Sequence, residues 1–162
     1  LSIRRQRQMC IRDRLHLVKL PLSFRLKAVV ILDSVKRLNM LAETFRKTGG
    51  VHVAALYSAH GDLMVYAEDV GRHNAVDKVI GLCALKRLDF SKCFLALSGR
   101  LTGDIVLKAA RMRIPVLASL AAAVDSGIEA AKRTGVSLIG FVRGQRMNVF
   151  TGLKRIVVTE TR

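Results

Sequence analysis

The sequence predicts a single α/β domain in which helices cover both faces of a mixed β-sheet, giving three layers. In the second half of the chain, short apolar runs typical of buried strands alternate with helical segments of about ten residues. That alternation predicts right-handed crossovers and a largely parallel sheet. An apolar hairpin in the first half adds an antiparallel strand. At 162 residues the chain is long enough for one domain with a sizeable core.

The first fourteen residues, LSIRRQRQMCIRDR, have no helical or strand period and no signal-peptide pattern. Residues 1–14 are therefore expected to be a leader foreign to the native protein. They hold five Arg and one Asp, so the formal charge falls from +16 to +12 without them. The remaining positive charge favours an anionic partner, such as a nucleotide, a phosphorylated cofactor or a nucleic acid.

Residues 15–48 are expected to form a connecting segment followed by an amphipathic helix. Apolar side chains recur every three or four positions from about Val29 to Arg46, and the Gly49–Gly50 pair ends this helix. After this helix, apolar runs bounded by turn-forming residues predict two strands. The helix-like segment that follows them predicts a second helix. The expected elements are strands at 51–57 and 63–67, a turn at 58–62 and a helix at 74–86.

Residues 49–162 are expected to contain the whole sheet. Pro115 is tolerated because it stands near the start of its strand, and Gly135 ends the last helix. The elements expected in the second half are strands at 93–98, 114–119, 137–142 and 147–151, with helices at 104–112 and 125–133.

The segment EDVGRHNAVDK, residues 68–78, carries more ionisable groups around one glycine than a simple connection needs. It follows a strand and opens a helix, which predicts a site at the mouth of the sheet. The alternative is a well-capped junction, with Asn74 or Asp69 as the cap. His73, at the helix start, is a candidate for hydrogen bonding to a ligand or for acid–base chemistry near neutral pH.

Two further loops follow strands and suit anions. SGRLTGD, residues 98–104, contains small residues and Arg100 just before a helix. Free amides at a helix N-terminus and an arginine are suited to binding an oxyanion or a phosphate. The alternative is an ordinary loop with Thr102 as N-cap. RGQR presents Arg143 and Arg146 on either side of Gly144, and these guanidinium groups are suited to a pyrophosphate. The alternative there is a solvated basic hairpin tip.

The histidines and cysteines do not predict a metal site. His52 and His73 raise the question, but there is no Cys pair and no H-x-x-x-H, so zinc is not expected. None of the three cysteines lies in a C-x-x-C motif. Cys83 and Cys93 lie in apolar surroundings and are expected to be buried thiols of a reducing cytosol, while Cys10 belongs to the leader.

Four segments together resemble the carboxy-terminal domain of the formate dehydrogenase accessory sulfurtransferase family, FdhD. They are KTGGVHVAAL (47–56), EDVGRHNAVDKVIG (68–81), LSGRLTGDIVLKAARMRIPVLAS (97–119) and GFVRGQRMNVFT (140–151). The similarity extends over about residues 15–162, and EDVGRHNAVDK is its most specific part.

The resemblance implies a cytosolic, homodimeric protein that relays sulfur from a cysteine desulfurase to the molybdenum bis(molybdopterin guanine dinucleotide) cofactor, which formate dehydrogenase then receives. In the family a cysteine of a C-x-x-C loop carries this sulfur as a persulfide, upstream of the part that matches residues 15–50. That motif is absent from this chain. The chain is therefore expected to be an amino-terminally truncated member with no catalytic cysteine, binding the cofactor without sulfur transfer.

The cofactor-binding stretch of the family falls on the loop that joins the strands at 137–142 and 147–151, so residues 49–162 are the expected cofactor-binding domain. The residues implied by the resemblance are Phe141, Val142, Arg143, Gly144, Gln145 and Arg146. Chemistry more than resemblance adds Arg72, His73 and Arg100 from neighbouring strand ends. Gly103–Asp104 departs from the aromatic residue and Glu of many relatives, which affects the shape of that loop.

The architecture also looks like the cytidine deaminase fold. His73 is followed by Asn74–Ala75, without the catalytic Glu, and SGRLTGD replaces the zinc-binding cysteines, so deamination is not expected. A second alternative, a basic nucleotide- or nucleic-acid-binding domain without catalysis, is motivated by the charge alone. With 5% aromatic residues and no Trp, the sequence lacks a stacking platform for specific nucleic-acid recognition.

Overall fold

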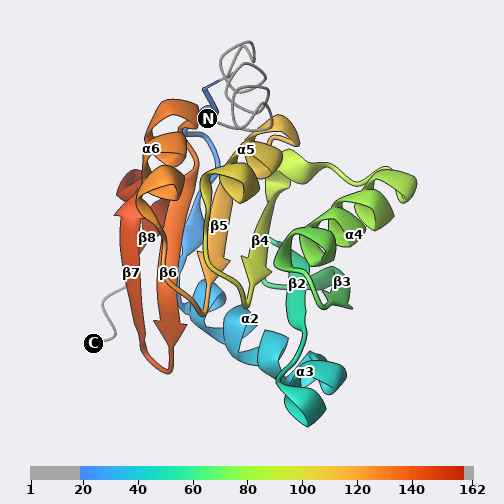
Figure 1. The fold of residues 1–162 in the computed structure, drawn as a ribbon. Helices are drawn as coiled ribbons and strands as arrows, with labels where there is room; N and C mark the ends of the chain where they lie inside the picture. The colour runs from blue at the N-terminus through green and yellow to red at the C-terminus, as the bar shows by residue number, and fades with distance from the viewer. Residues whose placement is uncertain (1–18, 159–162) are drawn as a thin grey trace, which may run out of the picture.

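The structure, a computed structural model, describes residues 19–158 of the chain (Figure 1). The predicted leader lies outside these residues. The described elements, in chain order, are β1 (Leu26–Lys27), α2 (Ala28–Leu41), α3 (Glu43–Thr48), β2 (His52–Ser58), β3 (Leu63–Asp69), α4 (Arg72–Leu85), η1 (Phe90–Lys92), β4 (Cys93–Leu97), α5 (Gly103–Arg111), β5 (Val116–Ser119), α6 (Asp125–Thr134), β6 (Ser137–Arg143), β7 (Arg146–Thr151), η2 (Leu153–Arg155) and β8 (Ile156–Val157). Within this part of the chain, no helix combines the length and apolarity needed to cross a bilayer.

One sheet organises the domain, with strand order β3-β2-β4-β5-β6-β7. Parallel pairing joins β4 to β5 and β5 to β6, while β2 is antiparallel to both β3 and β4, and β7 is antiparallel to β6. The predicted mixed sheet is confirmed. It is not largely parallel, because two hairpins supply its outer strands and leave only the middle for crossover connections.

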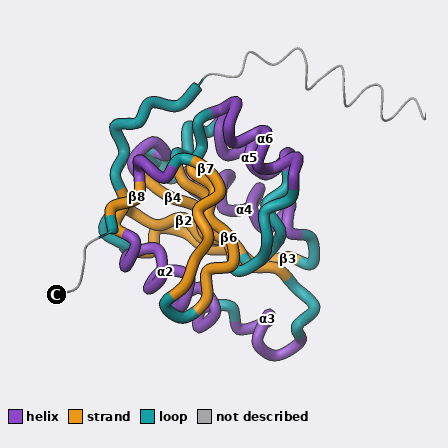
Figure 2. Tube along the Cα trace, turned by 90° about the vertical axis from the view of Figure 1, so that its left-hand side faces the viewer, coloured by secondary structure: helices purple, strands orange, loops and turns teal. Residues whose placement is uncertain are grey.

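Two separate apolar layers hold the helices to the sheet. Strand residues alternate between its faces, so Leu95 and Leu97 belong to one buried cluster while Phe94 and Ala96 belong to the other. Helices α4, α5 and α6 cover the first face, and α2 with the short β1–β8 ladder covers the second (Figure 2). The three-layer prediction is thereby confirmed.

The single helix predicted from Val29 to Arg46 is wrong, because the chain breaks at Ala42 into α2 and α3. Ala42 has φ −77° and ψ 78°, outside the helical region. In a continuous helix the amides of Thr44 and Phe45 would bond to carbonyls four residues back. They bond instead to the Glu68 carboxylate, at 3.3 and 2.8 Å. A distant side chain thus satisfies two amides and permits the break.

The strand directions bring the polar loops to one edge of the sheet, which we call the rim. Strands β3, β4, β5 and β6 end there, and β2 and β7 begin there, as the pairing of His52 with Asp69 and of Arg143 with Arg146 shows. In Figure 1 the rim is the lower edge, where the β6–β7 hairpin turns. Ligands of α/β proteins collect at such an edge.

Candidate functional site

The segment of residues 68–78 uses most of its polar side chains to hold its own surroundings together. The Glu68 carboxylate accepts the two amides of α3 described above. Asp69 accepts a hydrogen bond from the Gly71 amide at 2.9 Å and pairs with Lys78 at 2.6 Å. Asp77 pairs with Lys108 of α5, also at 2.6 Å. The Asp69 contacts fix the start of α4 against the end of β3, while the Glu68 and Asp77 contacts attach α3 to β3 and α4 to α5.

The alternative of a well-capped junction is wrong in its cap, because neither Asn74 nor Asp69 caps α4. The residue at the N-cap position is Gly71, which has no side chain to cap with, while Asp69 accepts from the Gly71 amide and from Asn74 Nδ2 at 3.1 Å. The remaining side chains of the segment's polar set, Arg72 and His73, are left for other contacts. The segment therefore stabilises its own junction and still leaves Arg72 and His73 as candidates for binding a ligand.

The Asp69 contacts predict a characteristic pH dependence of stability. The Lys78 ammonium first, then the Gly71 amide and Asn74, lower the pKa of Asp69 from 3.8 to about 2. A carboxyl with a depressed folded-state pKa stabilises the fold above its unfolded pKa and loses this effect as pH falls through the folded one. The melting temperature of Asp69→Asn should lie below that of the unaltered chain above about pH 4, and the gap should close towards pH 2. Thermal unfolding across this range measures it, and an unchanged gap at pH 2 would contradict it.

Arg72 packs into the rim beside the loop that follows β4. A Cβ added at Gly99 would lie 2.8 Å from the Arg72 Cβ and 3.4 Å from His52 Nδ1, so the three residues meet closely. Arg72 Nε is buried and has no hydrogen-bond partner within residues 19–158. A guanidinium nitrogen in that state is a donor available to a ligand.

Two histidines flank Arg72, and both are biased towards the neutral form. Burial first, then Arg72, lowers the pKa of His52. Burial, Lys108 and Arg72 likewise lower the pKa of His73, against smaller opposing effects of Asp104 and Asp77. Neutral imidazoles donate and accept hydrogen bonds at pH 7 without adding charge. His52 Nδ1 already lies 3.2 Å from Ser98 Oγ, which also accepts from the Val53 amide.

The loop of residues 98–104 is fixed by the last residue of β5 and by the loop that follows it. The Ser119 hydroxyl donates to the Gly99 carbonyl at 2.6 Å, and Leu101 forms a parallel bridge to Ala123. Arg100, between them, is exposed at the rim. Thr102 occupies the N-cap position of α5 but makes no side-chain cap, and its Oγ1 is buried without a partner among the described residues. The alternative of an ordinary Thr102-capped loop is therefore wrong.

The predicted cofactor loop, residues 141–146, contains a local distortion of the β6–β7 hairpin. Phe141 has φ 53°, in the left-handed region, and the strand register shifts between Gly140 and Arg143. Left-handed non-glycine residues and bulges concentrate at functional sites. Here the bulge leaves the Phe141 ring 43% exposed, tilted against Phe150. Val142 points into the core, and Arg143, Gly144, Gln145 and Arg146 are exposed.

A hollow of about 360 Å³ opens at the rim next to this hairpin. Its lining combines an aromatic ring, a hydroxyl and a guanidinium, contributed by Phe45, Ser98, Leu120, Ala121 and Arg143. The structure thus places the predicted site residues at one edge of the sheet, with Arg143 lining the hollow, Arg72 beside Gly99 and Arg100 in the same loop. Val142 is the exception, because its side chain is buried.

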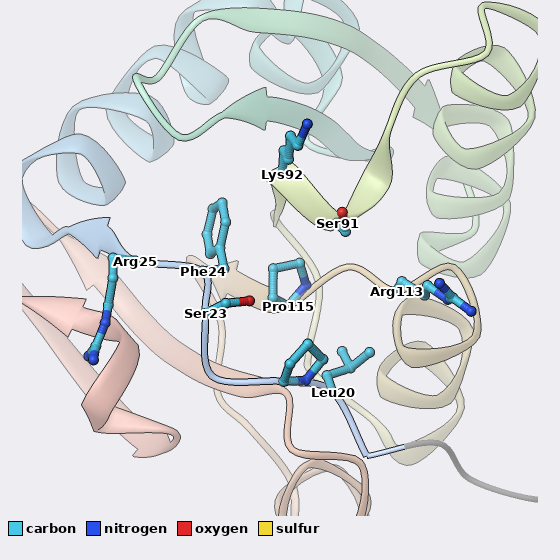
Figure 3. Close-up of a pocket in the computed structure, with 9 residues that line it drawn as sticks. Leu20, Ser23, Phe24, Arg25, Ser91, Lys92, Arg113 and Pro115 are labelled. Atoms are coloured by element: carbon cyan, nitrogen blue, oxygen red, sulfur yellow. The ribbon is translucent and has the colours of Figure 1, made fainter.

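A larger cavity of about 590 Å³ lies at the opposite edge, where β4 and β5 begin (Figure 3). Its interior is formed by Leu20, Pro21 and Pro115 with the Ser23 and Ser91 hydroxyls, while its cations lie around it. Figure 3 shows Arg25 and Lys92 directed away from the centre. The Arg25 guanidinium binds the Lys154 carbonyl, and Lys92 pairs with Asp89. None of the described residues that line this cavity was predicted as a site residue.

Cys83 and Cys93 are buried thiols, as predicted. Burial raises the pKa of Cys83, and burial first, then Cys83 and Asp89, raises the pKa of Cys93 to about 11. Thiols in this state are poor nucleophiles at neutral pH.

Sequence reasoning missed Phe45, Ser98 and His52 as parts of the rim. The helical period places Phe45 in the continuous helix, and the residue type raises His52 only as a metal ligand. The available signal for His52 was its place at the start of an antiparallel strand, because such a strand begins where its parallel neighbours end. Ser98 was within the predicted loop but its contacts with β2 were not expected.

Comparison with known proteins identifies the family. Residues 4–157 match the model of the FdhD/NarQ family. The chain is 44% identical over 133 residues to the sulfur carrier protein FdhD of Methanothermobacter thermautotrophicus, covering 82% of this chain and 53% of that protein. It is 48% identical over 118 residues to the protein of the same name from Thermoplasma volcanium, covering 73% and 42%. The chain thus spans about half the length of the curated relatives it matches.

The fold agrees with this match. A crystal structure from Desulfotalea psychrophila, described as that of a formate dehydrogenase accessory protein, superposes with a TM-score of 0.80 at 37% identity, covering 87% of this chain and 58% of that one. Sequence and structure therefore agree, and this chain belongs to the FdhD/NarQ family.

Proposed function

We propose that this chain is the cofactor-binding part of a sulfur carrier that serves formate dehydrogenase, and that it binds the molybdenum bis(molybdopterin guanine dinucleotide) cofactor at the rim. The observation that carries the proposal is the gathering of Arg72, Arg100, Arg143 and Arg146 at one edge of the sheet. The ligand is the cargo of the protein and carries two pyrophosphates, for which guanidinium groups are the best-matched side chains.

The rim residues fit such a ligand. Arg143 and Arg146 pair directly across the Gly144 turn and are exposed, so both guanidinium groups are free to contact one pyrophosphate. The unpartnered Arg72 Nε and Thr102 Oγ1 supply buried polar groups that a bound phosphate or sugar would satisfy. Neutral His73 can donate one further hydrogen bond without competing for charge.

The wider biology is also part of the proposal. The relatives are named sulfur carriers, which supports a role in carrying sulfur. As the resemblance implies, we further propose that the sulfur passes from a cysteine desulfurase to the bound cofactor, in a homodimeric, cytoplasmic protein. Neither Cys83 nor Cys93 is proposed to carry the persulfide, because both thiols are buried with raised pKa values. The likeness to the cytidine deaminase fold stays a prediction.

Guanosine diphosphate, a fragment of the cofactor, tests the proposed site. Calorimetric titration should show binding to the unaltered chain and a loss of about 10- to 100-fold in affinity for the double variant Arg143→Ala/Arg146→Ala. The reason is that hydrogen bonds to charged groups contribute about 1.5–3 kcal/mol each, of which part is recovered by water.

The matched control is Lys132→Ala/Arg133→Ala. These two cations are exposed in the last turn of α6, at the edge of the sheet away from the rim, and their removal changes the net charge by the same amount. Affinity should stay within about twofold of the unaltered chain at 0.15 M salt, where charges more than a Debye length of about 8 Å away are screened. Equal weakening by both pairs would reduce the effect to net charge and remove the hairpin from the site.

A further inference from the structure

Helix α3 stands at the rim with little packing of its own to hold it there. Every residue of Glu43–Thr48 is exposed or half-buried, and the helix lies between the non-helical Ala42 and the left-handed Gly49 (φ 62°). Such a short helix is not stable by itself, because most helical stability in proteins comes from packing. Its position must therefore be set by contacts with other elements.

The Glu68 carboxylate supplies that contact. Its Oε1 accepts from the Phe45 amide at 2.8 Å and its Oε2 from the Thr44 amide at 3.3 Å. Burial by itself raises the pKa of Glu68, but the hydrogen bonds from Phe45 and Thr44 outweigh it and leave the pKa lowered. Glu68 is thus ionised at neutral pH and binds the first turn of α3 to the end of β3.

The helix held in this way places an aromatic ring in the rim hollow. Phe45 lines the cavity of about 360 Å³ together with Arg143, and the other lining residues are Ser98, Leu120 and Ala121. The Phe45 side chain is half-buried, so part of it remains accessible to solvent. Nucleobases stack on aromatic rings, phenyl rings among them, and on guanidinium planes.

We propose that Phe45 forms a stacking subsite for the purine base of the nucleotide at the rim hollow, with the neighbouring Arg143 guanidinium left to the phosphates, and that Glu68 is a positioning residue that holds Phe45 there through α3. The inference rests on the proposed function and refines it: the arginines grip phosphate, while the hollow recognises the base. A diphosphate without a base should then bind more weakly than guanosine diphosphate and should not depend on Phe45.

Titration of both guanosine diphosphate and inorganic pyrophosphate against variants of the full chain separates these roles. Phe45→Leu keeps an apolar side chain for packing but removes the aromatic face, and should weaken guanosine diphosphate binding about 5- to 100-fold, as base–aromatic stacking of 1–3 kcal/mol implies. Pyrophosphate affinity should stay within about twofold. Phe45→Tyr keeps the ring and should retain the affinity for guanosine diphosphate.

Glu68→Gln tests the positioning role. It keeps the size of the side chain but weakens its hydrogen bonds with the α3 amides, so guanosine diphosphate binding should fall several-fold while pyrophosphate binding does not fall. Glu43→Gln is the matched control, because it removes the same charge from α3, where Glu43 pairs only with Lys47 among the described residues. That control should leave the affinities for both ligands unchanged.

The outcomes distinguish this inference from the proposed function. Guanosine diphosphate that binds the unaltered chain no better than pyrophosphate, or that binds Phe45→Leu unchanged, would overturn the stacking subsite and leave the phosphate site standing. Equal losses of both ligands in Phe45→Leu would make Phe45 a support for the hairpin and overturn the subsite as well. Failure of the unaltered chain to bind either ligand would overturn both proposals.

Discussion

Gly127→Ala is expected to destabilise the protein by about 2–4 kcal/mol, because the added methyl group would overpack against main chain that is held in place. A Cβ at this position in α6 would lie 2.3 Å from the Leu101 carbonyl oxygen and 3.1 Å from its carbonyl carbon. Leu101 is fully buried, its amide donates to the Ala122 carbonyl at 3.0 Å, and its carbonyl accepts from the Val124 amide at 3.1 Å. The clash therefore involves fixed main chain.

Urea denaturation measures this effect, with Gly81→Ala as its control. Gly81 lies within α4, and a Cβ there would meet nothing within 4 Å among the described residues. Because Ala is the better helix former, Gly81→Ala should stabilise the fold by about 0.5–1 kcal/mol.

Gly127→Ala should also weaken guanosine diphosphate binding, because a displaced Leu101 would move the adjacent Arg100. Stability within about 0.5 kcal/mol of the unaltered chain would show that α6 shifts freely.

Arg155→Met should destabilise the protein by about 3–5 kcal/mol, because it leaves several buried acceptors without donors. The Arg155 side chain is 0% exposed. It donates to the carbonyls of Gly135 at 2.5 Å, Leu20 at 3.2 Å and Pro21 at 2.6 Å, and to the Ser137 hydroxyl at 3.1 Å. One guanidinium therefore joins the beginning of the described chain to α6, β6 and the final turn.

Thermal and urea unfolding test this second effect against Lys154→Met. Lys154 is the exposed neighbour of Arg155, so the control makes the same change of charge and size on the surface. It should alter the free energy of unfolding by less than about 0.5 kcal/mol. Arg155→Lys should recover only part of the loss, because an ammonium group has fewer donors and no planar fork. A fully stable Arg155→Lys would show that charge, rather than the four hydrogen bonds, is what this site needs.

The elements that sequence patterns predicted correctly are those whose formation depends on local periodicity. The strands from Cys93 to Leu97 and from Val116 to Ser119 are short apolar runs, and they occur where expected. The break at Ala42 was not predictable in this way, because its cause is Glu68, more than twenty residues away. The two-residue β1–β8 ladder likewise depends on the meeting of two segments far apart in the sequence, and no local pattern predicts that.

The position of the candidate site was predictable, but which of its residues stabilise the fold and which are available to a ligand was not. Glycine-bearing polar loops at strand ends identified Arg72, Arg100 and the hairpin of residues 141–146, and topology alone then brought them to one edge. The sequence could not show that Glu68, Asp69 and Lys78 mainly make structural contacts, since the same types of side chain also bind ligands. The left-handed Phe141 was equally hidden, because glycine is the usual residue for that conformation.

The separation of the rim from the edge where the described chain starts has a practical consequence for measuring these affinities. Leu20 lies by the amino ends of β4 and β5. Those strand ends are at the top of the view in Figure 1, while the β6–β7 hairpin turns at the bottom. A molecule captured on a sensor chip by an affinity handle ahead of Lys19 would thus present its arginine loops to the flowing solution. Immobilisation by the leading end would leave them accessible, whereas random coupling through surface amines would bury a fraction of them against the matrix.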